Sequence, residues 1–180
     1  MLDLLVSRSA KQRVLTYLAD APSQAFFENQ IAQGSGVSIA SAHYAVHALA
    51  AEGLLRRESR GRRVAYAVDL AQPVARQWKV LLTLARLEPL LLALRPVADR
   101  VILFGSCASG TDHEDSDVDL YVRTALPGEA REIVEASPQG RRVQLVAKTV
   151  LDEAEAERNS PVFLENVRRG LVLYDKGAGL

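Results

Sequence analysis

Two short apolar runs and the polar residues at their ends constrain this chain more than any other feature. Residues 101–104 are apolar and end at Gly105 and Ser106, and ten residues later a second apolar run carries Asp117 and Asp119. Each run is typical of a short buried strand. Side chains at i and i+2 of a strand point to the same face, so the two carboxylates should project side by side. Such a pair is costly unless a cation neutralises it, so the pattern predicts a divalent metal site, with Mg²⁺ bridging to substrate phosphates.

The same residues carry a resemblance to a known family. The turn at Gly105 and Ser106, the ten-residue spacer and Asp117-x-Asp119 resemble the signature of the DNA polymerase β-type nucleotidyltransferase superfamily, most closely its small, minimal branch. The resemblance covers about the last 80 residues. It implies that Gly105 and Ser106 hold ATP or another nucleoside triphosphate at a helix N-terminus, where free N–H groups favour phosphate. It also implies that Asp117 and Asp119 bind Mg²⁺ and act in catalysis.

Two positions depart from the family pattern. Members usually carry a third carboxylate on a later strand, and here Gln144 stands at that position within the run 142–146. A neutral amide cannot act as the base that deprotonates an attacking hydroxyl. Small members also often carry an arginine at the position that Ser109 occupies in this chain. The serine leaves no cation there beside the triphosphate, which should weaken triphosphate binding.

Two functions therefore remain as alternatives. The first is Mg²⁺-dependent transfer of a nucleotidyl group to an acceptor hydroxyl, and the sequence leaves open whether that acceptor is an antibiotic, a protein, an RNA end or DNA. The second is a transcriptional regulator whose degenerate domain only binds nucleotide or a partner protein. A solvated acidic loop is a third interpretation, because Asp112, Glu114 and Asp115 crowd the spacer. Such a loop would require neither the Gly-Ser turn nor the apolar alternation around the Asp pair.

The first 70 residues predict three helices followed by a β-hairpin. The helices are expected at 9–19, with Ser9 as N-cap, at 26–33, and at 39–52, with Ser38 as N-cap. The third helix should bury Ile39, Ala42, Val46 and Leu49. Strands are expected at 54–59 and 63–69, joined by a turn that Gly61 permits.

This order of elements resembles a winged helix-turn-helix over about residues 5–70, in the manner of ArsR- or MarR-like regulators. The resemblance implies duplex DNA as a partner. Phosphate contacts are expected from the arginines around the hairpin turn, which are Arg56, Arg57, Arg60, Arg62 and Arg63. Contacts to base edges are expected from the outer face of the third helix, which carries Ser41, His43, Tyr44 and His47. The alternative is a module used for dimerisation or protein contacts.

His43 and His47 are spaced as a metal-binding pair on a helix would be. With no cysteine or carboxylate near them in the sequence, we interpret them as surface polar residues rather than as metal ligands.

The fold class expected is α+β in three parts: a winged helix at 1–70, a helical linker at 71–96 and a nucleotidyltransferase-type mixed sheet with flanking helices at 97–180. The linker should form one helix or two, broken or kinked at Pro89. Beyond the Asp pair we expect a turn at 126–128 and helices at 129–136, 149–158 and 161–169. Strands are expected at 141–147 and 171–174.

Composition and charge suggest where such a protein works. Net charge is zero, but residues 1–95 carry +5 and residues 96–180 carry −5, which indicates a basic module joined to an acidic one. Cys107 is the single cysteine, so no intrachain disulfide can form. The apolar stretch 80–94 is interrupted and too short for a membrane span. We therefore expect a cytoplasmic homodimer, and the family resemblance adds a HEPN-type partner protein of the toxin–antitoxin kind.

Overall fold

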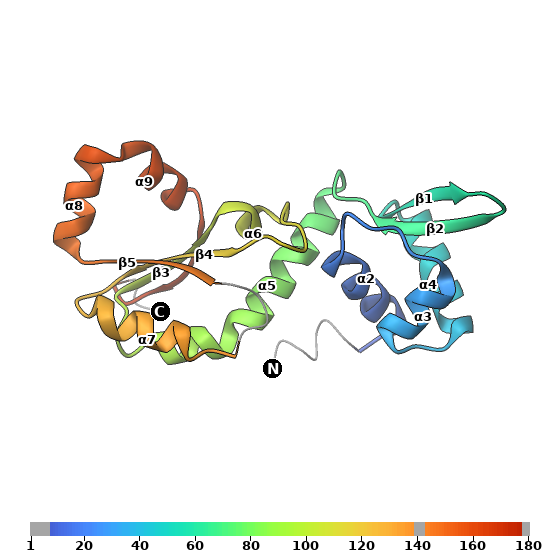
Figure 1. Cartoon of the computed structure of the whole chain (residues 1–180), viewed down its shortest axis with the longest axis horizontal. Helices are drawn as coiled ribbons and strands as arrows, with labels where there is room; N and C mark the ends of the chain where they lie inside the picture. Colours follow the sequence, from blue (N-terminus) through green and yellow to red (C-terminus); the bar gives the residue numbers. More distant parts are fainter. Residues whose placement is uncertain (1–7, 139–142, 178–180) are drawn as a thin grey trace. The chain divides into compact units, whose positions relative to one another are not determined.

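The computed structural model describes residues 8–138 and 143–177, which form two compact units (Figure 1). The N-terminal unit contains the residues up to Ala85 together with Gly110–Asp115. The C-terminal unit contains Arg86–Ser109 and the residues from Ser116 onward. Among the described residues, no helix combines the length and the apolar character needed to cross a lipid bilayer.

The N-terminal unit consists of three helices, a two-stranded antiparallel hairpin and the first part of a long helix. These elements are α2 (Ala10–Asp20), α3 (Glu28–Ser35), α4 (Ile39–Ala51), β1 (Leu55–Arg60), β2 (Arg63–Val68) and α5 (Pro73–Leu94). The hairpin closes between Arg60 and Arg63, and Gly61 takes a φ of 64° that the two-residue turn requires. The helix caps at Ser9 and Ser38 form as expected, because each hydroxyl accepts a hydrogen bond from the backbone three residues later.

Two expectations for these helices are wrong. The second helix begins at Glu28 rather than at Phe26, because the backbone of Phe26 is hydrogen-bonded to Tyr66 of β2 in both directions. Ile39 is 66% exposed, whereas Ala42, Val46 and Leu49 are buried as expected. Ile39 is the first residue of α4, where the chain has only just entered the helix, so the core contacts begin one turn later.

The acidic loop Gly110–Asp115 is anchored within the N-terminal unit rather than solvated. Asp112 is 1% exposed, and its Oδ2 lies 3.1 Å from Nζ of Lys79, which is 5% exposed and donates a second hydrogen bond to Ala19 O. Glu114 accepts hydrogen bonds from the hydroxyl and the backbone N–H of Ser23. The interpretation of this segment as a solvated acidic loop is therefore wrong for Asp112 and Glu114, whereas Asp115 is exposed.

The C-terminal unit is a four-stranded mixed sheet in the order β5-β4-β3-β6. Its strands are β3 (Arg100–Phe104), β4 (Val118–Arg123), β5 (Val143–Lys148) and β6 (Leu171–Asp175). β3 pairs antiparallel with β4 and β6, and β4 pairs parallel with β5. The helices are α6 (Gly105–Ser109), α7 (Pro127–Glu135), α8 (Val150–Asn159) and α9 (Pro161–Arg168).

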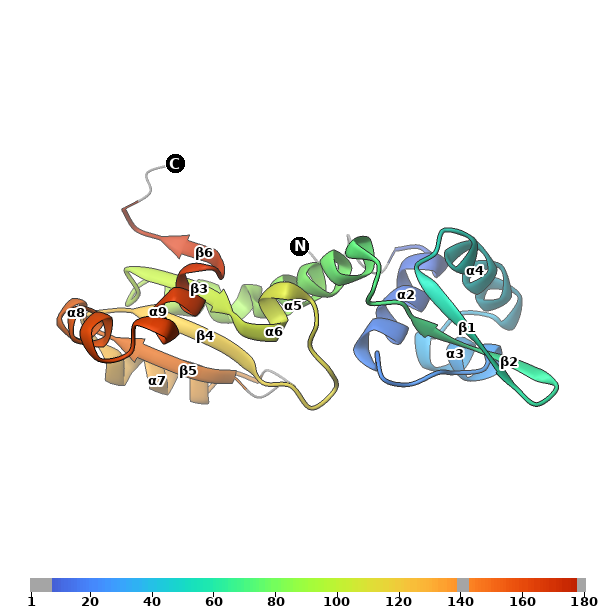
Figure 2. The ribbon, with the colours of Figure 1, turned by 90° about the horizontal axis from the view of Figure 1, so that it is seen from above.

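Helices cover both faces of this sheet. Figures 1 and 2 show α8 and α9 on one face and α7 on the other. Ile102 and Tyr121 pack against Leu164 and Val167 of α9, so these strand positions define the α9 face. A mixed sheet flanked by helices is the fold class expected for this part of the chain.

Several element boundaries differ from expectation. The 126–128 turn is absorbed into α7, which begins at Pro127 because proline is favoured in the first helical turn. α5 is a single helix that continues through Pro89, which is one of the two forms expected for the linker. The expected strand at 141–147 is observed as β5 from Val143, and Arg141 and Arg142 lie outside the described residues.

Candidate nucleotide and metal site

The end of β3 and the start of β4 bring the expected site residues together. In the antiparallel pairing of these strands Phe104 lies opposite Asp119, and Gly105 follows at once as the first residue of α6. Gly105 has a φ of 71°, and a Cβ built on it would collide with Asp119 Oδ2 and lie 3.2 Å from Asp119 Cγ. Only glycine lets this backbone approach the carboxylate so closely, and this approach is the local reason for a glycine here.

The carboxylate of Asp117 acts on that of Asp119 through its negative charge. Asp117 directly precedes β4 and Asp119 is its second residue, so their side chains share a face. Partial burial, and secondly the negative charge of Asp117, raise the pKa of Asp119. Cys107 packs beneath this segment, fully buried, with Sγ 3.5 Å from the Asp117 carbonyl oxygen. Two adjacent carboxylates, one of them partly buried, suit a divalent cation with oxygen ligands.

Gln144 lies beside Asp119 on the neighbouring strand. The parallel register of β4 and β5 pairs Asp119 with Gln144, and two residues further it pairs Tyr121 with Val146. Tyr121 and Val146 both contribute to the cluster beneath α9, so Asp119 and Gln144 share that face. The third position of the expected carboxylate set is thus spatially adjacent to the Asp pair, and an exposed amide occupies it.

A pocket of about 450 Å³ opens next to Gly105. Its lining residues include Ser109 of α6, Asn166 and Arg169. Phe104 and Phe163 also line it, and their rings meet edge to face at 5.8 Å. Arg169 also forms an exposed ion pair with Glu165. Asp117 and Asp119 are not part of the lining, but Gly105 adjoins both the pocket and Asp119.

Sequence reasoning missed Arg169. It follows Arg168 at the end of a helix 60 residues beyond Ser109, and the only local signal was this pair of adjacent arginines. The fold brings it into the same pocket as Ser109, the position at which a cation is lacking. An arginine therefore lines the pocket, with its guanidinium paired with Glu165 at the surface.

The five arginines of the hairpin are all exposed, but some of them already form ion pairs within the hairpin. Glu58, which sequence reasoning passed over, forms ion pairs with Arg56 at 3.1 Å and with Arg60 at 3.2 Å. These hydrogen bonds lower the pKa of Glu58. The alternation of charges along β1 was a usable signal, since residues 56, 58 and 60 share one face of the strand.

The remaining hairpin arginines contact aromatic rings or extend outward. The Arg63 guanidinium lies 3.8 Å from the centre of the Phe27 ring and donates to Asn29 at 2.9 Å. Arg57 lies 6.0 Å from the centre of the Tyr66 ring. Arg62 is exposed at the hairpin turn.

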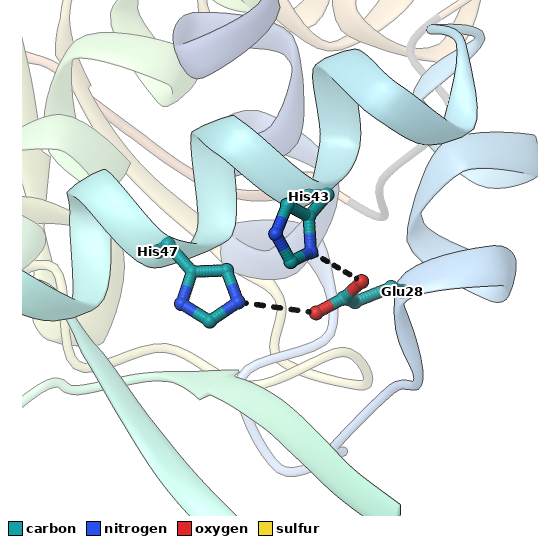
Figure 3. A group of neighbouring side chains, drawn as sticks. All are labelled: Glu28, His43 and His47. Carbon is teal, nitrogen blue, oxygen red and sulfur yellow. Dashed lines mark hydrogen bonds and ion pairs between the residues drawn. The ribbon is translucent and has the colours of Figure 1, made fainter.

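The residues expected on the outer face of α4 differ in their exposure and in their hydrogen bonds. Tyr44 is 75% exposed, and Ser41 accepts a hydrogen bond from the Ser38 hydroxyl. His43 and His47 both lie next to the carboxylate of Glu28 (Figure 3). Both histidines are exposed, as expected for surface polar residues, but packing brings them next to a carboxylate of the preceding helix that is distant along the chain.

Comparison with known families agrees with the description of the C-terminal unit. The family model for the nucleotidyltransferase domain matches residues 84–165. This segment contains α6, both aspartates and β5, so the mixed sheet fits a nucleotidyltransferase-type domain. No curated protein matches this chain.

Proposed function

We propose that the C-terminal unit binds a nucleoside triphosphate with Mg²⁺ and transfers its nucleotidyl group to an acceptor hydroxyl. The observation that carries this proposal is the close approach of Gly105 to the Asp119 carboxylate. This approach would place the turn at Gly105, which suits a phosphate, and the proposed metal ligands Asp117 and Asp119 in one site. The family match at residues 84–165 supports nucleotidyl transfer in general.

Each residue then has a role that follows from its position. Asp117 and Asp119 would hold the Mg²⁺, which neutralises charge on the phosphates and polarises the one under attack. Gly105 and Ser106 seat the triphosphate through backbone N–H groups at the start of α6. Burial, and secondly the negative charge of Asp117, raise the pKa of Asp119, and a bound cation would relieve the repulsion between the two carboxylates.

We assign the neighbouring pocket to the nucleotide. Its volume lies in the usual range for a small-molecule site, and Phe104 and Phe163 offer aromatic surface to a base or sugar. Arg169 supplies the cation that Ser109 does not.

Gln144 favours a second candidate function. An amide beside Asp119 can accept or donate hydrogen bonds but cannot remove a proton from an acceptor. The alternative is therefore a regulator in which this unit binds nucleotide or a partner protein without transferring anything.

We further propose that the N-terminal unit is a winged helix that binds duplex DNA, with α4 directed to base edges and the β1–β2 hairpin as the wing. Because Glu58 already pairs with Arg56 and Arg60, the phosphate contacts rest mainly on Arg57, Arg62 and Arg63. The homodimer, the HEPN-type partner and the cytoplasmic location stay predictions.

Incubation with α-labelled ATP, Mg²⁺ and cell extract tests the transferase proposal. Label should pass to a defined acceptor with the wild-type chain and not with Asp119→Asn. If Mg·ATP binds at this site and no transfer occurs, the regulator is the correct alternative. If neither nucleotide binding nor transfer is found, the transferase proposal fails and the unit can only be a regulator that binds a partner protein.

A further inference from the structure

Three polar side chains of the N-terminal unit converge at the interface between α3 and α4. His43 and His47 lie one turn apart on α4, and Glu28 is the first residue of α3 (Figure 3). His43 Nδ1 lies 3.0 Å from Glu28 Oε2, and His47 Nε2 lies 3.5 Å from Glu28 Oε1. One ligand atom from each residue can be chosen so that all three lie within 4.8 Å of one another. Figure 3 shows both imidazole rings beside the one carboxylate.

These spacings are close to those that a tetrahedral metal site requires. With metal–ligand bonds of about 2.0–2.1 Å, ligand atoms around a tetrahedral ion are separated by roughly 3.3–3.4 Å. The two nitrogen–oxygen distances, which involve different oxygens of Glu28, lie on either side of that value. One ligand atom from each residue lies within 4.8 Å of the others, so the side chains would have to rotate toward one another to hold an ion.

We propose that Glu28, His43 and His47 form a binding site for a divalent transition metal of the zinc class. Two imidazoles and a carboxylate suit Zn²⁺, Ni²⁺ or Cu²⁺, whereas Mg²⁺ prefers oxygen ligands alone. Three protein ligands leave a fourth position for water or another group. This site is separate from the Asp117–Asp119 pair, which belongs to the C-terminal unit.

The surrounding structure holds the ligands in place while leaving them accessible. Ile31 of α3 and Val46 of α4 are both fully buried in one core cluster, which fixes the two helices against each other. The side chains of His43, His47 and Glu28 remain 51%, 46% and 30% exposed, so an ion can enter from solvent.

Tyr66 provides a neighbouring hydroxyl. Its oxygen lies 3.5 Å from His47 Nε2, the nitrogen that would bind the metal, so it is placed to hydrogen-bond a metal-bound water rather than the ring.

Zinc binding to the full chain tests the proposal. With ¹⁵N-labelled histidine, one equivalent of Zn²⁺ should shift the ring nitrogens of two of the three histidines and leave the third, His113, unchanged. The same one-equivalent site should weaken by about tenfold or more in His47→Ala and in Glu28→Gln, because each loses one ligand. Glu28→Gln keeps a hydrogen-bonding partner for both rings, so a fall in zinc affinity there reports metal binding rather than folding.

Two control variants identify the site. His113→Ala removes a histidine that lies beside Ser23 rather than Glu28, and it should bind zinc as the wild type does. Asp119→Asn should also keep this site, since it removes only the carboxylate of the other unit. The proposal is overturned if no histidine resonance moves at one equivalent. It is equally overturned if His47→Ala and Glu28→Gln bind zinc like the wild type, which would leave the cluster as an ion pair only.

Discussion

Gln144 of β5 is the direct cross-strand partner of Asp119 of β4, on the sheet face that α9 covers. A carboxylate at this position would share the metal with Asp119 and could accept the proton of an attacking hydroxyl. The identity of this one residue therefore separates the two proposed functions of the C-terminal unit.

Replacing Gln144 by aspartate should create or raise nucleotidyl transfer. The missing carboxylate is expected to contribute several kcal/mol of transition-state stabilisation, on the order of a hundredfold or more in rate. Mg·ATP affinity should change less, because Asp117, Asp119 and the Gly105 turn are retained. Label transfer from ATP measures the effect, with Gln144→Asn as the matched neutral control. Strong wild-type transfer that neither substitution changes would contradict this role for position 144.

Without metal, Asp119→Asn should stabilise the protein at neutral pH. The folded-state pKa of Asp119 is raised, so its contribution to stability is full at low pH, where it is protonated, and is lost as pH rises through that pKa. The difference between mutant and wild type should therefore grow from acidic to neutral pH in metal-free thermal melts. Mg·ATP should reverse the order by stabilising only the wild type, by about 2.7 kcal/mol at a ligand concentration of 100 Kd. A mutant with an equal Mg·ATP shift would place the nucleotide site elsewhere.

Gly105→Ala should both destabilise the C-terminal unit and abolish Mg·ATP binding. A side chain at a φ of 71° costs about 1–2 kcal/mol, and its Cβ would also displace the Asp119 carboxylate. Gly128→Ala is the control, since Gly128 lies in the first turn of α7 with open space around it. That change should be neutral or stabilising by up to about 1 kcal/mol. Denaturant melts and ATP titrations on both variants provide the comparison, and equal ATP affinity in the two would remove Gly105 from the site.

Glu58→Gln should tighten duplex DNA binding, because it releases Arg56 and Arg60 from their ion pairs. Wild-type affinity should fall steeply between roughly 50 and 200 mM salt, and the variant should show a steeper slope as more phosphates are neutralised. Glu52→Gln removes the same charge at the end of α4, outside the hairpin, and should change the slope less. Fluorescence anisotropy with a labelled duplex measures both slopes. No binding by the wild type at low salt would refute the DNA-binding proposal.

Asp112→Ala should destabilise the N-terminal unit by about 3–5 kcal/mol, because it leaves the buried Lys79 ammonium without its carboxylate. Lys79→Met combined with Asp112→Leu should recover part of this loss, since neither charge is then buried. Glu52→Gln breaks the exposed Lys11–Glu52 pair and should cost less than about 1 kcal/mol. Urea unfolding measures all three, and a loss for Asp112→Ala no larger than for Glu52→Gln would show that the buried pair adds little.

The local pattern of the sequence determined most elements and the adjacent pair of aspartates. Three kinds of signal act over only a few residues of the chain. They are the apolar alternation around Asp117 and Asp119, the glycine at the end of a strand, and the hydroxyl caps at Ser9 and Ser38. Their physical consequences are therefore readable without knowledge of what packs against them. Boundaries such as the start of α3 were missed because the Phe26 backbone is paired with Tyr66, 40 residues away.

Tertiary structure alone decided which distant side chains meet. Asp112 is buried against Lys79, Arg169 lines the same pocket as Ser109, and Glu28 lies beside both His43 and His47. Each partner comes from a different element, and its distance depends on strand register or on how two helices pack. Ion pairs and metal sites require atoms to lie within a few ångströms of one another. For residues on separate elements, the spacing along the chain does not determine that distance.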